Sequence, residues 1–337
     1  MGFYDFFELP VEDKRRAFQA VSQRNLLPPF AVEKDWWVSL TLTLLFESPW
    51  KDFLVFKGGT SLSKAWRVIE RFSEDIDLAL DRRYLGFEGE VTKTQVRKLR
   101  EKSHRWVVGE LFPYLEKQFA SLGYTVTVEL APIASKDQEP IQVNIYYPTH
   151  MPVSTFVSPR VQVEVGSRSL REPFVHRQIQ SLLGEAFPGQ GFSDVGIAVA
   201  TAIPERTFWE KMLLLHEEFQ KPLEKIRVNR LSRHLYDLVA LWEHGYGSQA
   251  LTQEGLFWDI VRHRARFTPV KEVEYAQLSP STILPLPPEA VAAAWARDYE
   301  IMRQEMIYGA SLDFEALLAQ VKGIQEECQQ LGWQGAF

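Results

Sequence analysis

The chain has 337 residues, of which 45% are hydrophobic and 24% charged, and its formal net charge is −6. This length and composition supply enough apolar material for the buried core of an ordinary globular protein, in one large or two small domains. The negative charge argues against a nucleic-acid coat protein, but it does not exclude an enzyme that meets nucleic acid through a local basic face.

The sequence gives no indication of a membrane-spanning segment, a signal peptide or a disulfide bond. No apolar run approaches the roughly twenty residues that cross a bilayer, and the N-terminal residues lack the order of a secretory signal peptide. We therefore expect a cytoplasmic protein without a membrane partner. The single cysteine, Cys328, excludes an intramolecular disulfide and a cysteine-cluster zinc site, and its helical surroundings favour a packing role.

The N-terminal part of the chain begins with helical periodicity and continues into a unit of short elements. Residues 52–56 form an apolar run that predicts a strand, and the KGGT sequence at 57–60 predicts a tight turn. Apolar residues at 61–69 recur at helical spacing, and residues 74–80 alternate as in a strand. The expected order is strand, turn, helix and strand.

The rest of the chain divides into a strand-rich part and a helical part. A long polar helix is expected from about Thr92 to Leu122. Alternation with period two then predicts strands of a mixed sheet at 125–130, 141–147 and 160–165. Helical patterns follow at 204–219, 231–244, 253–264, 288–307 and 314–331, with a proline-rich extended connector at 278–288. We predict an α+β fold with a mixed-sheet domain at 1–200 and a mostly helical domain at 201–337.

Two aspartates on the second predicted strand are the first candidates for chemistry. Asp75 and Asp77 lie two residues apart, so both side chains emerge on one face of the strand. Such carboxylates repel each other unless a cation neutralises them, and their oxygens suit Mg²⁺ (or Mn²⁺) that bridges to substrate phosphates. By the same parity, the Ser73 hydroxyl would lie beside the phosphates or the metal. Taken alone, the pattern describes a solvated strand face equally well.

The glycine turn before these aspartates favours a phosphate site. Gly58 and Gly59 permit a tight backbone path whose N–H groups can point at phosphate oxygens. Thr60 or Ser61 then begins a helix, and a helix N-terminus favours anions. A turn that holds a triphosphate, followed by carboxylates that hold metals, suits two-metal catalysis. The turn is not a Walker A loop, because the sequence contains no GxxxxGK[ST].

The sequence resembles the AbiEii/AbiGii-type nucleotidyltransferase toxins, a family that includes the MenT-like tRNA-modifying toxins and the DUF1814-like toxins. The similar segments follow the family's order across most of the chain: EKDWWV (33–38), FKGGTSLSKAW (56–66), ERFSEDIDLAL (70–80), PERTFWEKMLLLHEE (204–218) and SRHLYDLVAL (232–241). Their combination is more specific than any single segment. Many members of the broader superfamily have Gly-Ser where this chain has Gly59-Thr60. The gap before the first aspartate is also longer here, as in the toxin branch.

The resemblance implies that Lys211 and Asp237 complete the site beside the metal carboxylates, and that Arg206 helps to bind the triphosphate. Lys211 lies on an amphipathic helix from which a cation can reach a triphosphate, although it is equally typical of a surface lysine. Asp237 follows Arg233 by four residues, which would also suit an ordinary helical ion pair. The apolar neighbours of Asp237 favour a buried acid, which needs a partner or a catalytic role.

Glu164 is a candidate third metal carboxylate. It projects from the polar face of a predicted strand that is expected to neighbour Asp75 and Asp77. A solvent-facing glutamate on an alternating strand has the same pattern, so both interpretations remain open.

Two basic stretches, 93–106 and 221–234, are candidates for contact with an RNA backbone. A run of charges is more often a solvated helix face, and neither stretch decides the matter alone. Trp36 and Trp37 are assigned to core packing rather than to base stacking.

The resemblance implies a metal-dependent toxin of a toxin–antitoxin system with a nucleotidyltransferase-like catalytic domain at 1–200. The helical domain at 201–337 would complete the active site and the acceptor-binding surface. The expected reaction transfers a nucleotidyl group from an NTP to the 3′ end of tRNA, which inhibits translation and growth and serves in phage defence. The expected partner is a separately encoded antitoxin with a winged-helix DNA-binding domain. Two alternatives are an enzyme that transfers AMP or UMP to a protein hydroxyl, and a non-catalytic regulatory module that binds GTP or ATP.

Overall fold

The computed structural model describes residues 2–73, 75–123, 125–135, 138–152 and 158–334. The chain folds into two compact units, the first of Met1–Ala65 and Phe72–Thr201 and the second of Trp66–Arg71 and Ala202–Phe337. The short segment Trp66–Arg71 was not anticipated, because it folds with the second unit although both of its neighbours in sequence belong to the first. The roles predicted for the two domains, catalysis for 1–200 and completion of the active site for 201–337, stay predictions.

The first unit combines helices with a sheet. Its helices are α1 (Gly2–Glu8), α2 (Val11–Asn25), α3 (Pro29–Phe46), α4 (Gly58–Lys64), α5 (Lys93–Trp106), α6 (Phe112–Ser121) and α7 (Leu182–Ala186). Its strands are β1 (Leu54–Lys57), β2 (Asp75–Leu80), β3 (Thr127–Leu130), β4 (Ile141–Tyr146), β5 (Arg160–Gly166), β6 (Phe174–Ile179) and β7 (Ile197–Ala202).

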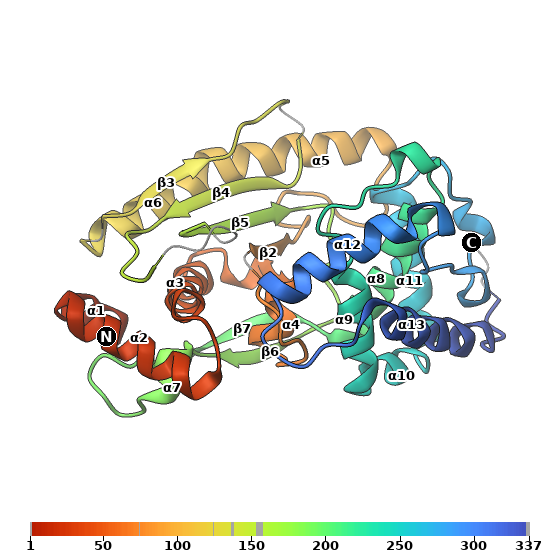
Figure 1. The fold of residues 1–337 in the computed structure, drawn as a ribbon. Coiled ribbons are helices and arrows are strands. Elements are labelled where there is room, and N and C mark those ends of the chain that lie inside the picture. The colour runs from red at the N-terminus through yellow and green to blue at the C-terminus, as the bar shows by residue number, and fades with distance from the viewer. Residues whose placement is uncertain (1, 74, 124, 136–137, 153–157, 335–337) are drawn as a thin grey trace. The chain divides into compact units, whose positions relative to one another are not determined.

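The strands form one seven-stranded sheet in the order β3-β4-β5-β2-β1-β7-β6 (Figure 1). Strand β2 runs antiparallel to β1 and parallel to β5, so the predicted mixed sheet and α+β class are confirmed. The three alternating segments are strands as predicted, within two residues at each end. Strands β6 and β7 were not predicted. Four of the six residues of β6 are exposed, and such an edge strand lacks the alternation that marks a half-buried one.

Two helices of the first unit differ from the prediction. Helix α4 begins at Gly58 and ends at Lys64, so Trp66 and Ile69 lie beyond it despite their helical spacing. The long polar helix is confirmed, with Thr92 as its N-cap in a capping box. It is interrupted by a π-helical turn at Val107–Leu111, which separates α5 from α6.

The core of the first unit lies on the apolar side of the sheet. Residues with no exposed surface there include Phe56, Ile76, Leu78, Val163 and Ile145. Helix α3 packs on β5, and α6 packs on β3 (Figure 1).

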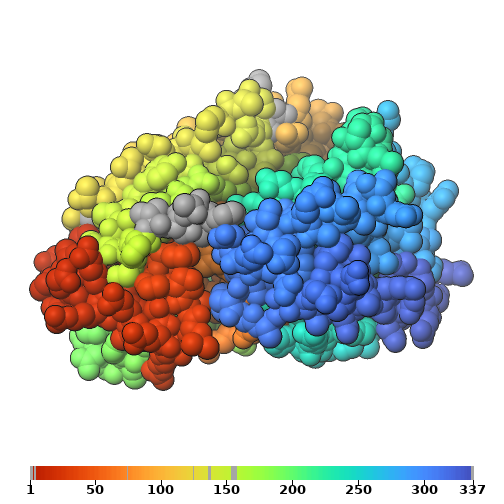
Figure 2. Space-filling view, in the orientation of Figure 1, coloured from red at the N-terminus to blue at the C-terminus, as the bar shows by residue number. Residues whose placement is uncertain are grey.

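Helix α3 is buried along most of its length, and its aromatic residues belong to the core. Trp36 and Trp37 are each 2% exposed, which confirms their predicted packing role. Tyr147 stacks on Trp37 with ring centroids 4.9 Å apart. The Glu33 carboxylate accepts a hydrogen bond from the main-chain N–H of His150 at 2.7 Å. These contacts hold the red helical region against the yellow-green segment after β4 (Figure 2).

The second unit contains helices at the positions where the sequence pattern predicted them. Its helices are α8 (Pro204–Phe219), α9 (Arg233–Glu243), α10 (Tyr246–Ala250), α11 (Glu254–Phe267), α12 (Glu289–Glu305) and α13 (Phe314–Gln329). The short helix α10 was not predicted, and the proline-rich connector contains a 3-10 turn at Pro280–Thr282. Cys328 is fully buried on α13, which confirms its packing role. Within the described residues, every helix is too short or too polar to cross a membrane.

Candidate active site

Four polar side chains form a row across neighbouring strands of the first unit. Lys57 of β1 pairs in register with Asp77 of β2, and Asp77 pairs with Glu164 of β5. Glu164 in turn pairs with Gln142 of β4. Residues paired directly in register project from the same face of a sheet. Glu164 therefore neighbours Asp77 as the alternation indicated, whereas its role as a metal ligand stays a prediction.

The environment of Glu164 disfavours its negative charge. The side-chain amides of Gln142 and Gln162 donate to Glu164 Oε1 at 2.6 and 2.8 Å. Burial and, second to it, the charge of Asp77 raise the pKa of Glu164 above its ordinary value, and they outweigh these two hydrogen bonds, which lower that pKa. Asp75 lies one pleat further along β2, in register with Gln162. This face of the sheet therefore carries negative charge that a bound cation would stabilise.

The carboxylates of this face fit a metal that is shared with a substrate. Within the described parts of the chain, no group of three or more His, Cys, Asp or Glu side chains could hold a metal ion by itself. Mg²⁺ commonly takes only one or two protein carboxylates and completes its shell with water and substrate phosphates. Asp75 and Asp77, both half-buried, supply that number, and Glu164 stands beside Asp77. The donor set suits an open site rather than a closed protein cage.

Gly58 allows the start of α4 to approach the Asp77 carboxylate closely. Its φ of +78° lies in the left-handed region, and a Cβ atom built on it would lie 1.9 Å from Asp77 Oδ2. Both the backbone conformation and the close approach therefore require glycine at this position. Gly59 follows within α4, so the predicted tight turn is the first turn of the helix rather than a loop before it.

The hydroxyl groups near the glycines are used within the fold. Thr60 Oγ1 donates to the main-chain oxygen of Asp75 at 2.5 Å and lies 3.0 Å from Ser73 Oγ, while Ser61 Oγ donates to the Gly58 oxygen at 2.9 Å. Thr60 and Ser61 are buried, and Ser73 precedes β2 rather than lying on it. Ser73 therefore does not share a strand face with Asp75 and Asp77. The predicted nucleotide contacts of Thr60 and Ser61 stay predictions. Because their hydroxyl groups are used within the fold, such contacts would come from the main-chain N–H groups of the first helical turn.

Asp237 lies at the centre of a buried ion network in the second unit. Arg71 donates from Nε to Asp237 Oδ1 at 2.7 Å and from Nη2 to Oδ2 at 2.8 Å, a two-pronged geometry typical of strong pairs. Lys211 Nζ lies 2.6 Å from Asp237 Oδ2. The residues are 2%, 0% and 6% exposed for Arg71, Asp237 and Lys211. The surface alternative for Lys211 is therefore wrong, and Asp237 pairs with cations from two other segments of the chain.

The network fixes the charge states of its members. Burial would raise the pKa of Asp237, but the charges of Arg71 and Lys211 outweigh it and hold that pKa below its ordinary range. Burial lowers the pKa of Lys211, and Asp237 opposes this shift. Lys211 Nζ also lies 3.2 Å from His234 Nδ1, and burial with the nearby Lys211 charge lowers the pKa of His234 well below its usual value. Asp237 is consequently a weak base that is suited to holding the Lys211 ammonium group.

The other predicted site residue of the second unit is Arg206 on α8. Its side chain has no exposed surface, and Nε donates to Glu210 Oε1 at 2.9 Å, one helical turn away. Its predicted contact with the triphosphate stays a prediction.

Arg71, Lys57 and Gln162 were not predicted from the sequence. Strand parity contained the signal for Gln162, which alternates with apolar neighbours on its strand, whereas Lys57 ends the apolar run 53–56 and no alternation marks it. Arg71 lies in an irregular segment, and no local pattern announces its long-range pair with Asp237.

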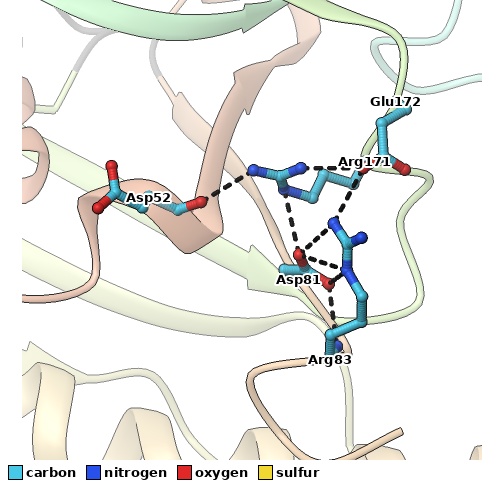
Figure 3. Close-up of polar contacts among 5 residues, drawn as sticks. All are labelled: Asp52, Asp81, Arg83, Arg171 and Glu172. Atoms are coloured by element: carbon cyan, nitrogen blue, oxygen red, sulfur yellow. Dashed lines mark hydrogen bonds and ion pairs between the residues drawn. The ribbon is translucent and has the colours of Figure 1, made fainter. Parts of the chain in front are cut away.

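A separate polar cluster lies at the other end of β2, where its ions are balanced (Figure 3). Asp81 follows β2 directly and accepts hydrogen bonds from Arg83, and Arg171 lies 3.5 Å from it. Arg171 also donates to the main-chain oxygen of Asp52, and both arginines contact Glu172. Burial would raise the pKa of Asp81, but the hydrogen bonds from Arg83 outweigh it and lower that pKa. This cluster fixes the end of the strand and leaves no charge for a ligand to neutralise.

Comparison with known proteins assigns the chain to a family. The sequence matches the model of the AbiEii nucleotidyl transferase toxin, type IV toxin–antitoxin system, over residues 42–320. No curated protein matches the chain. The structure is similar to the crystal structure of JHP933 from Helicobacter pylori, with 13% sequence identity, a TM-score of 0.40 and coverage of 87% of this chain and 90% of that one. A likeness this weak carries no functional argument, whereas the family match extends over most of the sequence. The chain therefore belongs to the AbiEii family of nucleotidyl transferase toxins.

Proposed function

We propose that the chain is a metal-dependent nucleotidyltransferase toxin that transfers a nucleotidyl group from an NTP to the 3′ end of tRNA. Membership of the AbiEii family supports nucleotidyl transfer by a toxin of a toxin–antitoxin system. The observation that carries the metal dependence is the carboxylate face of β2, where Asp75 and Asp77 project together and Glu164 lies in register beside Asp77.

The first unit would supply the metal and phosphate contacts. Asp75 and Asp77, with Glu164 as a candidate third ligand, would hold Mg²⁺ or Mn²⁺ together with the triphosphate. A bound metal ion would neutralise phosphate charge and make the acceptor hydroxyl a better nucleophile. The hydroxyl oxygen would then bond to the α-phosphorus and release its proton to water, the bond from that phosphorus to the bridging oxygen would break, and pyrophosphate would leave. The N–H groups at the start of α4 would bind phosphate oxygens.

The second unit would supply positive charge. Lys211 is the candidate cation for the triphosphate, and Asp237 would orient its ammonium group instead of taking a proton, because Arg71 and Lys211 already stabilise the Asp237 carboxylate. A charge held in place before the reaction stabilises the transition state without a reorganisation cost. Arg206 is a further candidate for this role.

The proposed setting is the cytoplasm, where modification of tRNA would arrest translation and growth and so act in phage defence. The family implies an antitoxin partner. We propose that this partner is separately encoded and carries a winged-helix DNA-binding domain.

The proposal is tested by incubating the purified chain with each labelled NTP, Mg²⁺ and total tRNA. We expect label on tRNA that requires Mg²⁺, and a loss of about a thousandfold or more in the Asp75→Asn, Asp77→Asn double variant, because metal contacts contribute several kcal/mol to such transition states. The matched control is Asp259→Asn, since Asp259 is a 64% exposed aspartate of the second unit. It should retain full activity.

Other outcomes identify the alternatives. Label on protein instead of RNA would indicate a protein hydroxyl as the acceptor. Tight NTP binding without pyrophosphate release would indicate a regulatory module. Growth arrest in a bacterial host that persists in the double aspartate variant would contradict a metal-dependent mechanism.

A further inference from the structure

Helix α5 carries a concentrated positive charge in an acidic chain. It contains six lysine and arginine residues and one glutamate, whereas the whole chain has a net charge of −6. Its apolar positions, Leu99 and Trp106, are buried. The exposed cations of the helix are Lys93, Arg97, Lys98, Lys102 and Arg105, and we call this surface the α5 basic face.

Acidic side chains neutralise little of the α5 basic face. Arg97 lies 3.7 Å from Glu101, one turn further along the helix. Within the part of the chain that the structure describes, Lys93, Lys98, Lys102 and Arg105 form no ion pair. Lys102 instead donates to the main-chain oxygen of Leu85 at 2.9 Å, and Arg105 to that of Glu101 at 3.3 Å. Neither contact removes the positive charge, so the face remains available to a polyanion.

The other basic stretch of the chain, 221–234, is arranged differently. Lys221 and Arg227 both bind the carboxylate of Glu218, with closest distances of 2.7 and 2.6 Å. The main-chain N–H groups of Arg230 and Ser232 donate to Asp298 at 2.7 and 3.1 Å. The two stretches look alike in sequence, but Glu218 pairs with two cations of the second, whereas Lys98, Lys102 and Arg105 of the first form no ion pair among the described residues.

A hollow with one partly exposed aromatic side chain lies beside the C-terminal end of α5. The helix continues there into the π-helical turn Val107–Leu111, an irregularity that is frequent at functional sites. A hollow of about 370 Å³ opens beside it, lined by Tyr84, Leu85, Lys102, Arg105, Trp106 and Glu110. Trp106 itself is buried, so the half-buried Tyr84 is the ring that a base could reach beside Lys102 and Arg105.

We propose that the α5 basic face is the surface on which the first unit docks the phosphate backbone of an acceptor RNA. Lys98, Lys102 and Arg105 follow one another at spacings of four and three residues, so they share one side of the helix. A row of exposed cations that have no carboxylate partner among the described residues matches a chain of phosphates, which binds through counterion release. The inference rests on the proposed function, in which the acceptor is RNA.

The test is a titration of fluorescently labelled total tRNA with the full chain, without NTP, at several KCl concentrations. The variant Lys98→Gln, Lys102→Gln, Arg105→Gln removes three charges from exposed positions. We expect tRNA binding at least about tenfold weaker near 0.1 M salt, and a plot of log affinity against log salt whose slope is shallower by about 2 to 3. In the transfer assay the same variant should raise the KM for tRNA and leave kcat unchanged.

A matched control separates docking from a general loss of charge. The variant Lys225→Gln, Lys271→Gln, Lys322→Gln removes three charges from exposed lysines of the second unit. It should bind tRNA within about twofold of the wild type, because it leaves the proposed phosphate contacts intact. Circular dichroism and thermal unfolding check that both triple variants are folded.

Three results would overturn the inference. The first is unchanged tRNA affinity and salt slope in the α5 variant, and the second is an equal loss in the control variant. The third is displacement of tRNA by poly-L-glutamate as effectively as by unlabelled tRNA, which would assign the face to an acidic protein. Failure of the proposed function looks different, because then the wild type itself transfers no label to tRNA. Wild-type transfer with unchanged KM in the α5 variant rejects the docking surface alone.

Discussion

The carboxylates of the two units are placed in opposite electrostatic environments. Asp77 and Glu164 lie half-buried in register on a sheet, and burial, with a further contribution from the charge of Asp77, raises the pKa of Glu164. Asp237 is fully buried, yet Arg71 and Lys211 hold its pKa below the ordinary range. The same type of side chain is short of positive charge in one unit and fully compensated in the other.

This contrast indicates different contributions to the folded protein. A buried charge whose partners are already present is part of the fold, and removing one member leaves the others uncompensated. A pair of half-buried like charges costs some stability, and although the charge of Lys57 offsets part of it, the pKa of Glu164 remains raised, so a bound cation would relieve the rest. We therefore expect substitutions in the second unit to act mainly on stability, and those on the sheet to act mainly on ligand binding.

The largest effect is expected for Asp237→Asn, which keeps the size of the side chain but removes its charge. Arg71 and Lys211 would then be buried without a counter-charge, and the free energy of unfolding should fall by about 3 to 5 kcal/mol. Urea unfolding followed by circular dichroism measures the loss. Because the folded pKa of Asp237 is lowered, its stabilisation is present above the unfolded value of 3.8 and is lost as the pH falls through the folded value.

Asp259→Asn provides the matched comparison. Asp259 pairs with Arg262 at 2.6 Å within a helix of the same unit, but these side chains are 64% and 51% exposed. Its loss should cost less than about 1 kcal/mol. Equal losses in the two variants would show that burial does not distinguish the pairs, and the contrast between the two carboxylate environments would fail.

The second effect concerns the approach of α4 to the sheet. In Gly58→Ala the new Cβ atom would lie 1.9 Å from Asp77 Oδ2, at a residue whose φ is +78°. Strain and displacement of the carboxylate together should lower the free energy of unfolding by about 2 to 4 kcal/mol. The variant should also weaken the stabilisation by Mg²⁺ and NTP, measured as a shift in thermal midpoint, because Asp77 must move.

Gly89→Ala isolates the backbone strain in this experiment. Gly89 has φ of +61°, but a Cβ atom there would meet nothing within 4 Å. It should cost about 1 to 2 kcal/mol and leave the response to Mg²⁺ and NTP intact. If both glycine variants lose that response equally, the contact with Asp77 does not explain the requirement for Gly58.

Local patterns predicted most of the carboxylate face but little of the buried network. Alternation placed Asp75, Asp77 and Glu164 on polar faces, because strand parity is a property of neighbouring residues along the chain. Their strands do neighbour each other in the sheet. The same alternation wrongly placed Ser73 on this face. The strand begins at Asp75, so strand parity does not extend to Ser73.

The network around Asp237 depends on contacts between segments that are distant in sequence. Arg71 and Asp237 are 166 residues apart, and Arg71 sits in a segment without regular periodicity. Sequence spacing offered Arg233 as a helical partner for Asp237, since only local neighbours are visible to such a pattern. The predicted end of helix α4 was wrong for a related reason. The helical spacing of residues 61–69 continues past Lys64, where the helix ends, into a segment that folds with the second unit.

The smallest effect is expected for Glu164→Gln, which tests the repulsion between carboxylates on the sheet of the first unit. Because the folded pKa of Glu164 is raised above its unfolded value, its contribution to stability is fully present below the unfolded value of 4.5 and is lost as the pH rises through the folded value. Glutamine carries no charge at any of these pH values. Without metal, the thermal midpoint of the variant should equal that of the wild type near pH 4 and exceed it slightly at pH 8.

Addition of Mg²⁺ and a non-hydrolysable NTP should reverse this order at pH 8, because ligand that binds a carboxylate stabilises the wild type more than the variant. Glu129→Gln is the matched control, since Glu129 is an exposed glutamate on β3 of the same sheet, and its midpoint should follow that of the wild type at every pH. Equal stabilisation of the wild type and Glu164→Gln by Mg²⁺ and NTP would remove Glu164 from the metal ligands. The pH-dependent difference would then report only the burial of Glu164 and its repulsion from Asp77, and Asp75 with Asp77 would be left as the candidate metal ligands.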